Sequence, residues 1–262
     1  MEDTPYFKYQ GAGNDFILID NREGFFDPKN EEEINALCNR YFGIGGDGLI
    51  LIQEHESLDF EMVYFNSDGK QSTMCGNGGR CAVSFAYHLG IIEKNTSFQA
   101  IDGPHDAEVE NNGLVVNLKM VDVREIQDHT MHYFLDTGSP HHIEFKNDIE
   151  SIDVAKLGHS IRYGKPYNEE GSNVNFVELI NPSQIALRTY ERGVEGETLA
   201  CGTGATAAAL ASYFSKRTKE TCIEVEVLGG KLEVSFEDHG VEGFKNIWLK
   251  GPAKPVFKAT LL

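Results

Sequence analysis

Short apolar runs, separated by glycine and polar residues, dominate the chain. Several of them alternate apolar and polar positions between turn residues, which is typical of strands. Nine runs predict strands: 16–19, 49–52, 60–65, 113–120, 175–180, 185–190, 223–228, 231–236 and 247–250. Helical periodicity is rarer and predicts helices over 31–41, 78–89 and 205–214. Asn112-Gly113 predicts the turn of a hairpin. Because a helix does not follow each strand, the pattern favours a mainly antiparallel α+β fold over a doubly wound parallel sheet.

The chain contains an internal repeat with an offset of 126 residues. The segment Thr73–Gly78 aligns without gaps with Leu199–Gly204, so that Cys75 matches Cys201. Each half then consists of a strand, a polar loop with glycine, a Cys-Gly-x-Gly motif and a helix. A unit of this length is a small domain rather than a solenoid repeat. We therefore expect two similar halves with a cleft between them.

The sequence is acidic, with 23 Lys and Arg against 41 Asp and Glu and a formal net charge of −18. Proteins that neutralise nucleic-acid phosphates need a basic face, so the charge excludes that class, and it disfavours docking to anionic lipid. The longest mostly apolar run, 205–215, is too short to span a membrane, and the acidic N-terminus lacks a secretory signal. These features predict a cytoplasmic protein with neither a nucleic-acid nor a membrane partner.

The five cysteines are widely spread, and no two form a C-x-x-C pair. This spacing favours neither a zinc ribbon nor a thioredoxin-type motif. Without an export signal, the cysteines are expected to be reduced thiols.

The two Cys-Gly-x-Gly motifs each precede a predicted helix. A helix start exposes unpaired N–H groups and positive partial charge, which suits a substrate carboxylate and stabilises a thiolate. Two such thiols facing one carbon could supply a base on one side and an acid on the other. That arrangement fits inversion of a stereocentre beside a carboxylate.

Four motifs and both ends of the chain are similar to one known family. The motifs are Asn66–Gly69, Met74–Cys81, Gly171–Phe176 and Tyr190–Ala205, and the flanking matches are Tyr9–Phe16 and Gly251–Ala253. The chain thereby resembles the diaminopimelate epimerase family. The resemblance implies a pyridoxal-independent isomerase that interconverts LL- and meso-2,6-diaminopimelate for lysine and peptidoglycan synthesis, with neither a cofactor nor a metal.

The resemblance also implies a fold and a division of the chain. The fold is α+β, with two pseudo-symmetric halves that each roll an antiparallel sheet around a central helix, and with the active site in the cleft between them. The halves are placed at 1–120 plus 251–262, which carries Cys75, and at 121–250, which carries Cys201. A small-molecule substrate is the implied partner, and the sequence leaves open whether a homodimer forms.

Site residues follow from the resemblance. Cys75 and Cys201 match the catalytic thiols, and His141 and Glu191 match groups that tune the thiol pKa values. Substrate binding is assigned to Asn14, Asn66, Gly76, Asn77, Asn173, Glu191, Arg192, Gly202 and Thr203. Cys38, Cys81 and Cys222 are interpreted as packing residues, with Cys81 facing away from Cys75.

Three positions depart from common family patterns. Ser139 stands where many members carry Asn before Pro-His, Gly48 where some carry Gln, and Met74 where Gln often precedes the first thiol. None removes a catalytic group, so they affect the details of substrate recognition rather than the reaction.

Three other functions fit the sequence less well. The glycine runs at 43–48 and 202–207 lack the strand-before-helix context of a dinucleotide site. A proline-racemase-like enzyme of the same fold also uses paired thiols, but its compact substrate needs no Arg192 or added asparagines. A metal-binding protein using Cys75, Cys81, Cys201 and His141 is a further alternative, although their spacing matches no known zinc site.

Overall fold

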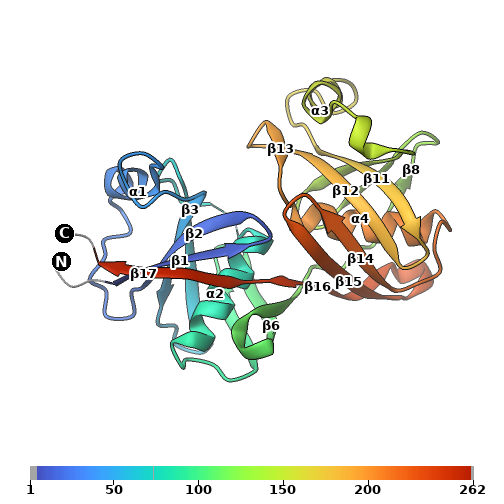
Figure 1. Ribbon diagram of the computed structural model, residues 1–262. Helices are drawn as coiled ribbons and strands as arrows, with labels where there is room; N and C mark the ends of the chain where they lie inside the picture. Colours follow the sequence, from blue (N-terminus) through green and yellow to red (C-terminus); the bar gives the residue numbers. More distant parts are fainter. Residues whose placement is uncertain (1–4, 73, 261–262) are drawn as a thin grey trace. The chain divides into compact units, whose positions relative to one another are not determined.

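The computed structural model describes residues 5–72 and 74–260, so Thr73 of the first cysteine motif lies outside the described residues. The chain divides into two compact units. The first runs to Leu118 and takes in the segment from Gly251 onward, and the second is Lys119–Lys250. In each unit, strands surround one central helix (Figure 1).

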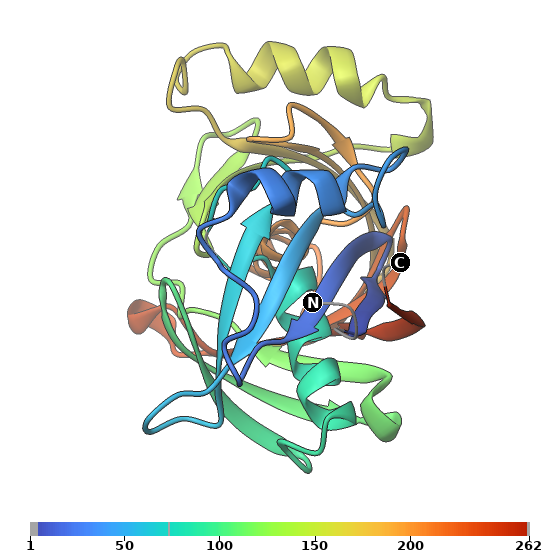
Figure 2. The same cartoon turned by 90° about the vertical axis from the view of Figure 1, so that its left-hand side faces the viewer.

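The first unit pairs its strands in the order β17-β1-β2-β3-β4-β5-β6-β7. Only β2–β3 and β4–β5 are parallel among these pairs. Figure 2 shows strands of this unit curving past α2, with α1 on their outer side. The elements are β1 (Pro5–Gly11), β2 (Asn14–Asp20), α1 (Glu31–Cys38), β3 (Gly48–Gln53), β4 (Phe60–Asn66), α2 (Gly76–His88), β5 (Asn95–Ala100), β6 (Gly103–Glu110), the 3₁₀ turn η1 (Asn111–Gly113), β7 (Val115–Lys119) and β17 (Lys254–Thr260).

The second unit pairs its strands in the order β8-β9-β10-β11-β12-β14-β15-β16, and β13 pairs with the end of β12. The pairs β10–β11 and β12–β14 are parallel. The elements are β8 (Gln127–Asp128), β9 (Tyr133–Asp136), β10 (Pro140–Phe145), η2 (Ile149–Ser151), α3 (Val154–Arg162), β11 (Asn173–Asn181), β12 (Gln184–Glu191), β13 (Gly196–Thr198), α4 (Gly202–Phe214), β14 (Cys222–Val227), β15 (Gly230–Asp238), η3 (Gly240–Glu242) and β16 (Phe244–Pro252).

The two units repeat one topology. From β1 to β7 and from β9 to β16, the pairs follow the same order: antiparallel, parallel, antiparallel, parallel, antiparallel, antiparallel. The central helices α2 and α4 are each 13 residues long and begin at Gly76 and Gly202, 126 positions apart. The predicted repeat and the α+β class are therefore confirmed, with two parallel pairs in each otherwise antiparallel arrangement.

Small side chains let the strands approach the central helices closely. In α2, residues 76–86 are all buried, and α4 is rich in alanine and buried over most of its length. A helix buried on every face is expected to carry mainly small or apolar residues, and both helices do so, with Asn77 and Arg80 as buried polar exceptions in α2. In the first unit, strands β1, β2, β3, β4, β6 and β17 contact α2, and in the second, β9, β10, β11, β12, β14 and β15 contact α4.

The observed elements extend the sequence prediction. The hairpin with Asn112-Gly113 in its turn is confirmed, with both residues at positive φ. Helix α3 was not predicted, because Gly158 interrupts its pattern. An added Cβ there would lie 2.4 Å from Cβ of Tyr190, so glycine permits the helix to pack on that ring. The interpretation of Cys222 as a packing residue was wrong, since it is exposed at the start of β14.

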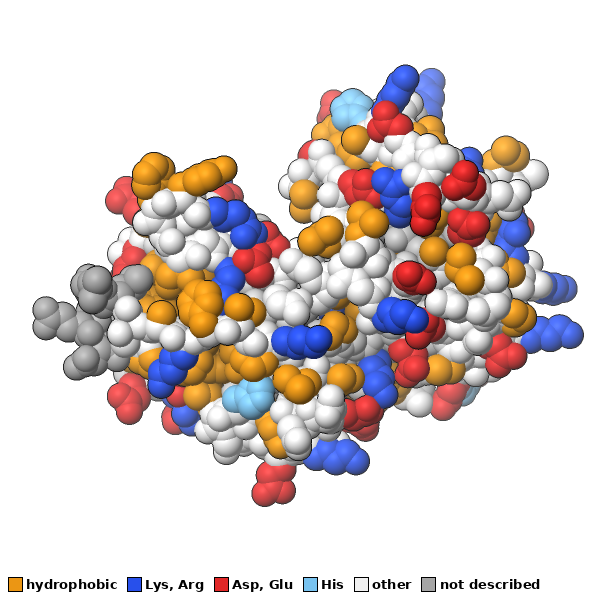
Figure 3. All heavy atoms as spheres, in the orientation of Figure 1, with side chains coloured by type: hydrophobic (Ala, Val, Ile, Leu, Met, Phe, Trp, Pro, Cys, Tyr) orange, Lys and Arg blue, Asp and Glu red, His pale blue; other side chains and the backbone are white. Residues whose placement is uncertain are grey.

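Lys and Arg side chains lie scattered among acidic ones on the face that Figure 3 shows. Tyr41 and Phe42, just after α1, are 91% and 93% exposed. Within residues 5–72 and 74–260, no helix has the length and apolar character needed to cross a membrane.

Candidate functional site

Cys75 and Cys201 occupy the same structural position in their units. Each is the N-cap residue of its central helix and has extended backbone angles. Cys75 is partly exposed and Cys201 is 6% exposed. Each cysteine therefore lies at a helix start, where unpaired N–H groups stabilise negative charge on a thiolate or a ligand.

The glycines of the two motifs leave room for their neighbours. A Cβ on Gly204 would lie 2.6 Å from Oδ1 of Asn175 and 3.2 Å from Sγ of Cys201. A Cβ on Gly79 would lie 2.9 Å from Sδ of Met74. Met74, one of the departures from the family pattern, therefore packs over the first turn of α2.

In the first unit, a chain of hydrogen bonds fixes two of the candidate substrate-binding asparagines. Nη2 of Arg80 donates to Oδ1 of Asn77 at 2.7 Å, and Nδ2 of Asn77 donates to Oδ1 of Asn14. Nδ2 of Asn14 then donates to Oδ2 of Asp47 at 2.9 Å. Because guanidinium can only donate and carboxylate can only accept, both amide orientations are determined.

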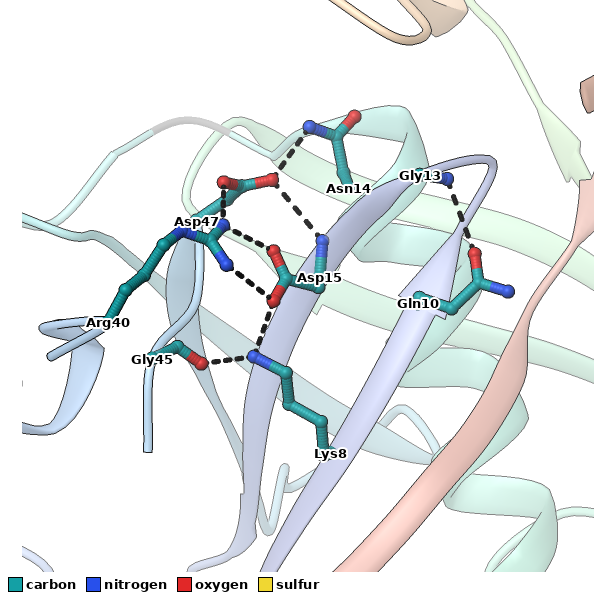
Figure 4. Close-up of polar contacts among 8 residues, drawn as sticks. All are labelled: Lys8, Gln10, Gly13, Asn14, Asp15, Arg40, Gly45 and Asp47. Carbon is teal, nitrogen blue, oxygen red and sulfur yellow. Dashed lines mark hydrogen bonds and ion pairs between the residues drawn. The ribbon is translucent and has the colours of Figure 1, made fainter. Parts of the chain in front are cut away.

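Asp47 belongs to a cluster of charged groups beside Asn14 (Figure 4). Arg40 binds Asp47 at 2.7 Å and Asp15 at 2.6 Å, and Lys8 binds Asp15 at 2.6 Å. Burial raises the pKa of Asp15, but hydrogen bonds and charge from Arg40 and Lys8 outweigh it, so the pKa is lowered overall. Asp15 therefore remains ionised, and the ion pairs of the cluster hold the loop before β3 against β2.

In the second unit, a different chain leads from Cys201 into the core. Sγ of Cys201 lies 3.5 Å from Oγ1 of Thr203, which accepts a hydrogen bond from Oγ of Ser139 at 3.2 Å. Oγ of Ser139 lies 3.0 Å from Nε2 of His141, and Nδ1 of His141 lies 3.1 Å from Nδ2 of Asn175.

The direction of this chain follows from Asn175. Its Nδ2 also donates to the carbonyl of His142 at 3.1 Å, and its Oδ1 accepts from Oγ1 of Thr189 at 2.9 Å. The amide nitrogen therefore faces Nδ1 of His141, which must accept. A neutral His141 then carries its proton on Nε2 and donates to Ser139, leaving the Ser139 hydroxyl to donate to Thr203 and the Thr203 hydroxyl to donate to Cys201.

His141 is fully buried, and this burial, followed by the charge of Arg192, lowers its pKa to about 3. It is neutral at physiological pH, as the direction of the chain requires. Its tautomer is thereby set by Asn175 rather than by a carboxylate.

Asn173 joins the same network. Its Nδ2 donates to the carbonyl of Pro140 at 3.0 Å and to Oγ of Ser139 at 3.3 Å, and its Oδ1 accepts from the backbone N–H of Arg192 at 2.9 Å. The Arg192 side chain is exposed and donates to the carbonyl of Glu170 at 3.1 Å. The second unit thus brings together Ser139, His141, Asn173, Thr203 and Cys201.

Two other predicted site residues, Asn66 and Glu191, lie at the ends of strands. Asn66 ends β4 and is exposed, and its backbone forms a turn with Gly69 and Lys70. Glu191 ends β12 and is partly buried. The N-cap of α4 is Cys201, and the Thr203 hydroxyl forms hydrogen bonds with the Cys201 and Ser139 side chains.

Gly48 has a steric reason to be glycine in this chain. A Cβ there would lie 2.3 Å from the carbonyl oxygen of Phe65 and 2.6 Å from the Tyr64 ring. A larger residue would have to displace β4, so this position cannot contribute a substrate-binding side chain here.

The sequence interpretation missed Asp47, Arg80 and Asn175. Arg80 is the one charged residue within the first twelve positions of α2, and a charge in an otherwise small and apolar helix could have indicated a role. Asn175 lies two residues after Asn173 on β11, so the alternation of a strand places both on one face. Within the part of the chain that the structure describes, no group of three or more His, Cys, Asp or Glu side chains is arranged to hold a metal ion.

Comparison with known proteins decides the family. A sequence model described as "Diaminopimelate epimerase" matches residues 6–125 and 133–256. The diaminopimelate epimerase of Flavobacterium psychrophilum is 53% identical over 97% of this chain and 99% of its own, and that of Chlorobaculum tepidum is 44% identical over 96% and 98%. The chain belongs to the diaminopimelate epimerase family. Members of the diaminopimelate epimerase family are isomerases, so the chain is an enzyme of that class.

Solved structures show the same fold at low sequence identity. A PhzF-family phenazine biosynthesis protein from Bacillus anthracis has a TM-score of 0.78 at 15% identity, with both chains covered completely. A hydroxyproline epimerase from Agrobacterium vitis has a TM-score of 0.69 at 12% identity, over 98% of this chain and 91% of that one. The fold of the diaminopimelate epimerase family is therefore shared with enzymes whose sequences differ widely.

Proposed function

We propose that this enzyme interconverts LL- and meso-2,6-diaminopimelate by proton transfer at one α-carbon, with Cys75 and Cys201 as the two proton carriers. One sulfur, as thiolate, removes the α-proton, and the other, as thiol, delivers a proton to the opposite face of the same carbon. No bond to the protein forms, and each turnover exchanges the protonation states of the two thiols. The reaction needs no cofactor because the thiols supply both base and acid.

The observation that carries this proposal is the equivalent placement of two cysteines at the N-caps of two equivalent helices. A single reactive thiol at a helix start would suit a hydrolase or a redox protein equally well. Two such thiols, in a family of epimerases, favour a reaction that requires one proton carrier on each side of a carbon.

The helix starts also supply the groups for the reacting carboxylate. We assign it to the backbone and side chains of Gly76, Asn77, Gly202 and Thr203. Negative charge builds up on this carboxylate as the α-proton leaves, and N–H groups at helix starts stabilise such charge where it develops. The fixed amides of Asn14 and Asn77 support this assignment, because an amide held by other hydrogen bonds need not reorient when substrate binds.

The second amino-acid group of diaminopimelate is assigned to Asn66, Asn173, Glu191 and Arg192. A guanidinium binds a carboxylate through two parallel hydrogen bonds, which suits Arg192 to the distal carboxylate. The backbone of Arg192 is positioned by Asn173, which supports a joint role for the two residues. Substrates without a distal amino-acid group would leave these polar residues unsatisfied.

The direct test compares LL-diaminopimelate with L-proline, followed by optical rotation with the purified enzyme. The expected result is epimerisation of diaminopimelate and no measurable racemisation of proline. Racemisation of proline with an unchanged diaminopimelate signal would instead establish a proline-racemase-like function. We place the expected activity in the cytoplasmic synthesis of lysine and peptidoglycan precursors.

A further inference from the structure

Arg80 is a fully buried cation whose hydrogen-bond partners are all neutral. Its guanidinium donates to Oδ1 of Asn77 at 2.7 Å, to the carbonyl of Gly76 at 3.4 Å and to the carbonyl of Pro252 at 3.4 Å. Within residues 5–72 and 74–260, it forms no ion pair with a carboxylate. A buried charge with no opposite charge is costly, so the site calls for an anion.

The position of Arg80 in α2 makes a compensating anion still more necessary. It lies in the second turn of α2, and its hydrogen bond to the carbonyl of Gly76 holds the guanidinium against the first turn, which begins one residue after Cys75. The start of a helix already carries positive partial charge, so a cation there is unfavourable unless an anion compensates both.

Charged and titratable groups on β1, on β2 and in the segment before β3 already have other partners. On β1 and β2, Lys8 and Asp15 pair with each other, and the Tyr9 hydroxyl on β1 lies 2.8 Å from His88 of α2, with a pKa raised by burial. Arg40 and Asp47, before β3, pair with each other. The guanidinium interacts electrostatically with Cys81 and Cys75, and these two interactions oppose the lowering of its pKa by burial.

Cys81 does not serve as that anion. It is fully buried, and burial raises the pKa of its thiol to about 12. Cys75 is partly exposed and lies at the helix start. It is therefore the sulfur at which negative charge is compensated by both the helix and the guanidinium.

The second unit has no equivalent cation. The residue 126 positions after Arg80 is Thr206, which is buried and donates to the carbonyl of Gly202 at 3.1 Å. Cys201 is instead contacted by the hydroxyl of Thr203, at the end of a chain of neutral groups that begins at Asn175. The two thiols thus sit in equivalent backbone positions, but the helix that follows Cys75 carries a buried guanidinium where the helix that follows Cys201 carries a hydroxyl.

We infer that Arg80 holds Cys75 as the thiolate in the substrate-free enzyme, while Cys201 carries the proton. This inference rests on the proposed two-thiol function and adds to it the resting state of the pair. Arg80 is a positioning residue in this account, because it acts on substrate only through Cys75.

The test measures the protonation of each thiol without substrate. In the Cys201→Ala enzyme, the rate of Cys75 alkylation by iodoacetamide is followed against pH, with peptide mass spectrometry to separate it from the other cysteines. The same profile is measured for Cys201 in the Cys75→Ala enzyme. The expected midpoint for Cys75 lies at least one pH unit below that for Cys201, the size of shift that a nearby opposite charge produces.

A second pair of variants isolates the charge of Arg80. Both substitutions are made in the Cys201→Ala background. Arg80→Gln keeps a hydrogen-bonding side chain but removes the positive charge. Arg80→Lys keeps the positive charge but removes the planar set of guanidinium N–H donors. Arg80→Gln is expected to raise the Cys75 midpoint by about one pH unit or more, and Arg80→Lys to leave it close to the parent value. In the Cys75→Ala background, Arg80→Gln is expected to leave the Cys201 midpoint unchanged, which is the matched control.

Two results would overturn the inference: equal midpoints for the two thiols, or the same Cys75 midpoint in the Gln and Lys variants. If an Arg80 variant does not fold, thermal unfolding of the single cysteine variants still tests the inference. Cys75→Ala removes the anion that compensates the buried Arg80, so it must destabilise the folded protein more than Cys201→Ala does. None of these measurements uses the epimerase reaction. An enzyme that epimerises diaminopimelate but shows equal midpoints would therefore retain its proposed function and lose only this inference.

Discussion

Arg80 and Thr206 occupy equivalent positions on α2 and α4, and each donates a hydrogen bond to the carbonyl four residues earlier, at 3.4 Å and 3.1 Å. The repeat thus preserves the geometry of the helix start while exchanging a cation for a neutral hydroxyl. A two-thiol enzyme that acts in both directions needs both sulfurs within reach of one carbon, but it does not need them to be alike when substrate is absent.

A glycine substitution at equivalent positions should affect the two helices differently. Gly204→Ala would place a Cβ 2.6 Å from Oδ1 of Asn175, whose amide is fixed by several hydrogen bonds and cannot yield easily. We expect a loss of about 1–3 kcal/mol in unfolding free energy together with a large loss of activity. The check is urea unfolding alongside the epimerase assay.

The matched control for that change is Gly78→Ala, 126 residues earlier. The nearest atom to its added Cβ is Cδ1 of Ile50 at 3.4 Å, an ordinary contact. Alanine also has the higher helix propensity, so this variant should be as stable as the parent or more so. Equal destabilisation by the two substitutions would contradict the packing described for Gly204.

Ser139→Ala should slow catalysis without abolishing it. The change removes the hydroxyl that links His141 to Thr203, so the Thr203 hydroxyl is no longer directed toward Cys201. A hydrogen bond to a charged group is worth about 1.5–3 kcal/mol, which corresponds to a fall in kcat of roughly tenfold or more. Steady-state kinetics in both directions provide the measurement.

Ser212→Ala is the control for Ser139→Ala. Ser212 is also buried, but its hydroxyl donates to the carbonyl of Ala208 within α4, far along the helix from Cys201. It should affect stability only. A fall in kcat as large as that of Ser139→Ala would argue against a directed chain ending at the sulfur.

Because His141 is buried in its neutral form, we expect the free energy of unfolding to depend on pH. Its folded pKa is lowered to about 3 from an ordinary value of 6.5, so between these values the unfolded state binds more protons than the folded state. Stability contributed by the neutral imidazole is thus complete above pH 6.5 and lost as the pH falls toward 3, with a slope of about 1.4 kcal/mol per pH unit for one such group.

Thermal unfolding between pH 7 and pH 4.5 tests this dependence. Wild type should lose more stability on acidification than His141→Gln, which cannot titrate. His132, whose pKa burial lowers to about 4, contributes over the same range in both proteins and cancels in the comparison. Parallel curves for the two proteins would show that His141 is not held neutral.

The sequence was sufficient for the repeat and for the central helices because Cys-Gly-x-Gly followed by a run of small residues has few interpretations other than a buried helix start. Strands were found where apolar residues are contiguous, as in 49–52. They were missed where a buried polar residue interrupts the run, as Lys8 does in β1 and the histidines 141 and 142 do in β10. Such residues are buried because partners distant in sequence satisfy them, and those partners are not visible in a local pattern.

The same limit applies to the candidate site. The family resemblance was enough to predict the cysteines and asparagines of the motifs as site residues. The roles of Asp47, Arg80 and Asn175 depend on which atom each side chain faces, which the sequence does not show. The sequence shows Arg80 as a single charge among small and apolar helix residues, but only the structure shows that it is buried without a carboxylate partner. The departure at Ser139 was visible, but its position between His141 and Thr203 required the structure.

The measurement that tests the two-thiol mechanism most directly is hydrogen exchange during turnover. Starting from LL-diaminopimelate in D2O, early product should carry deuterium at the inverted carbon, while recovered substrate stays almost free of it, because each thiol holds a single proton and the two faces use different sulfurs. Cys75→Ala and Cys201→Ala should each suppress inversion. Equal early exchange into substrate and product, or inversion at the normal rate by either variant, would contradict the assignment of Cys75 and Cys201 as the proton carriers.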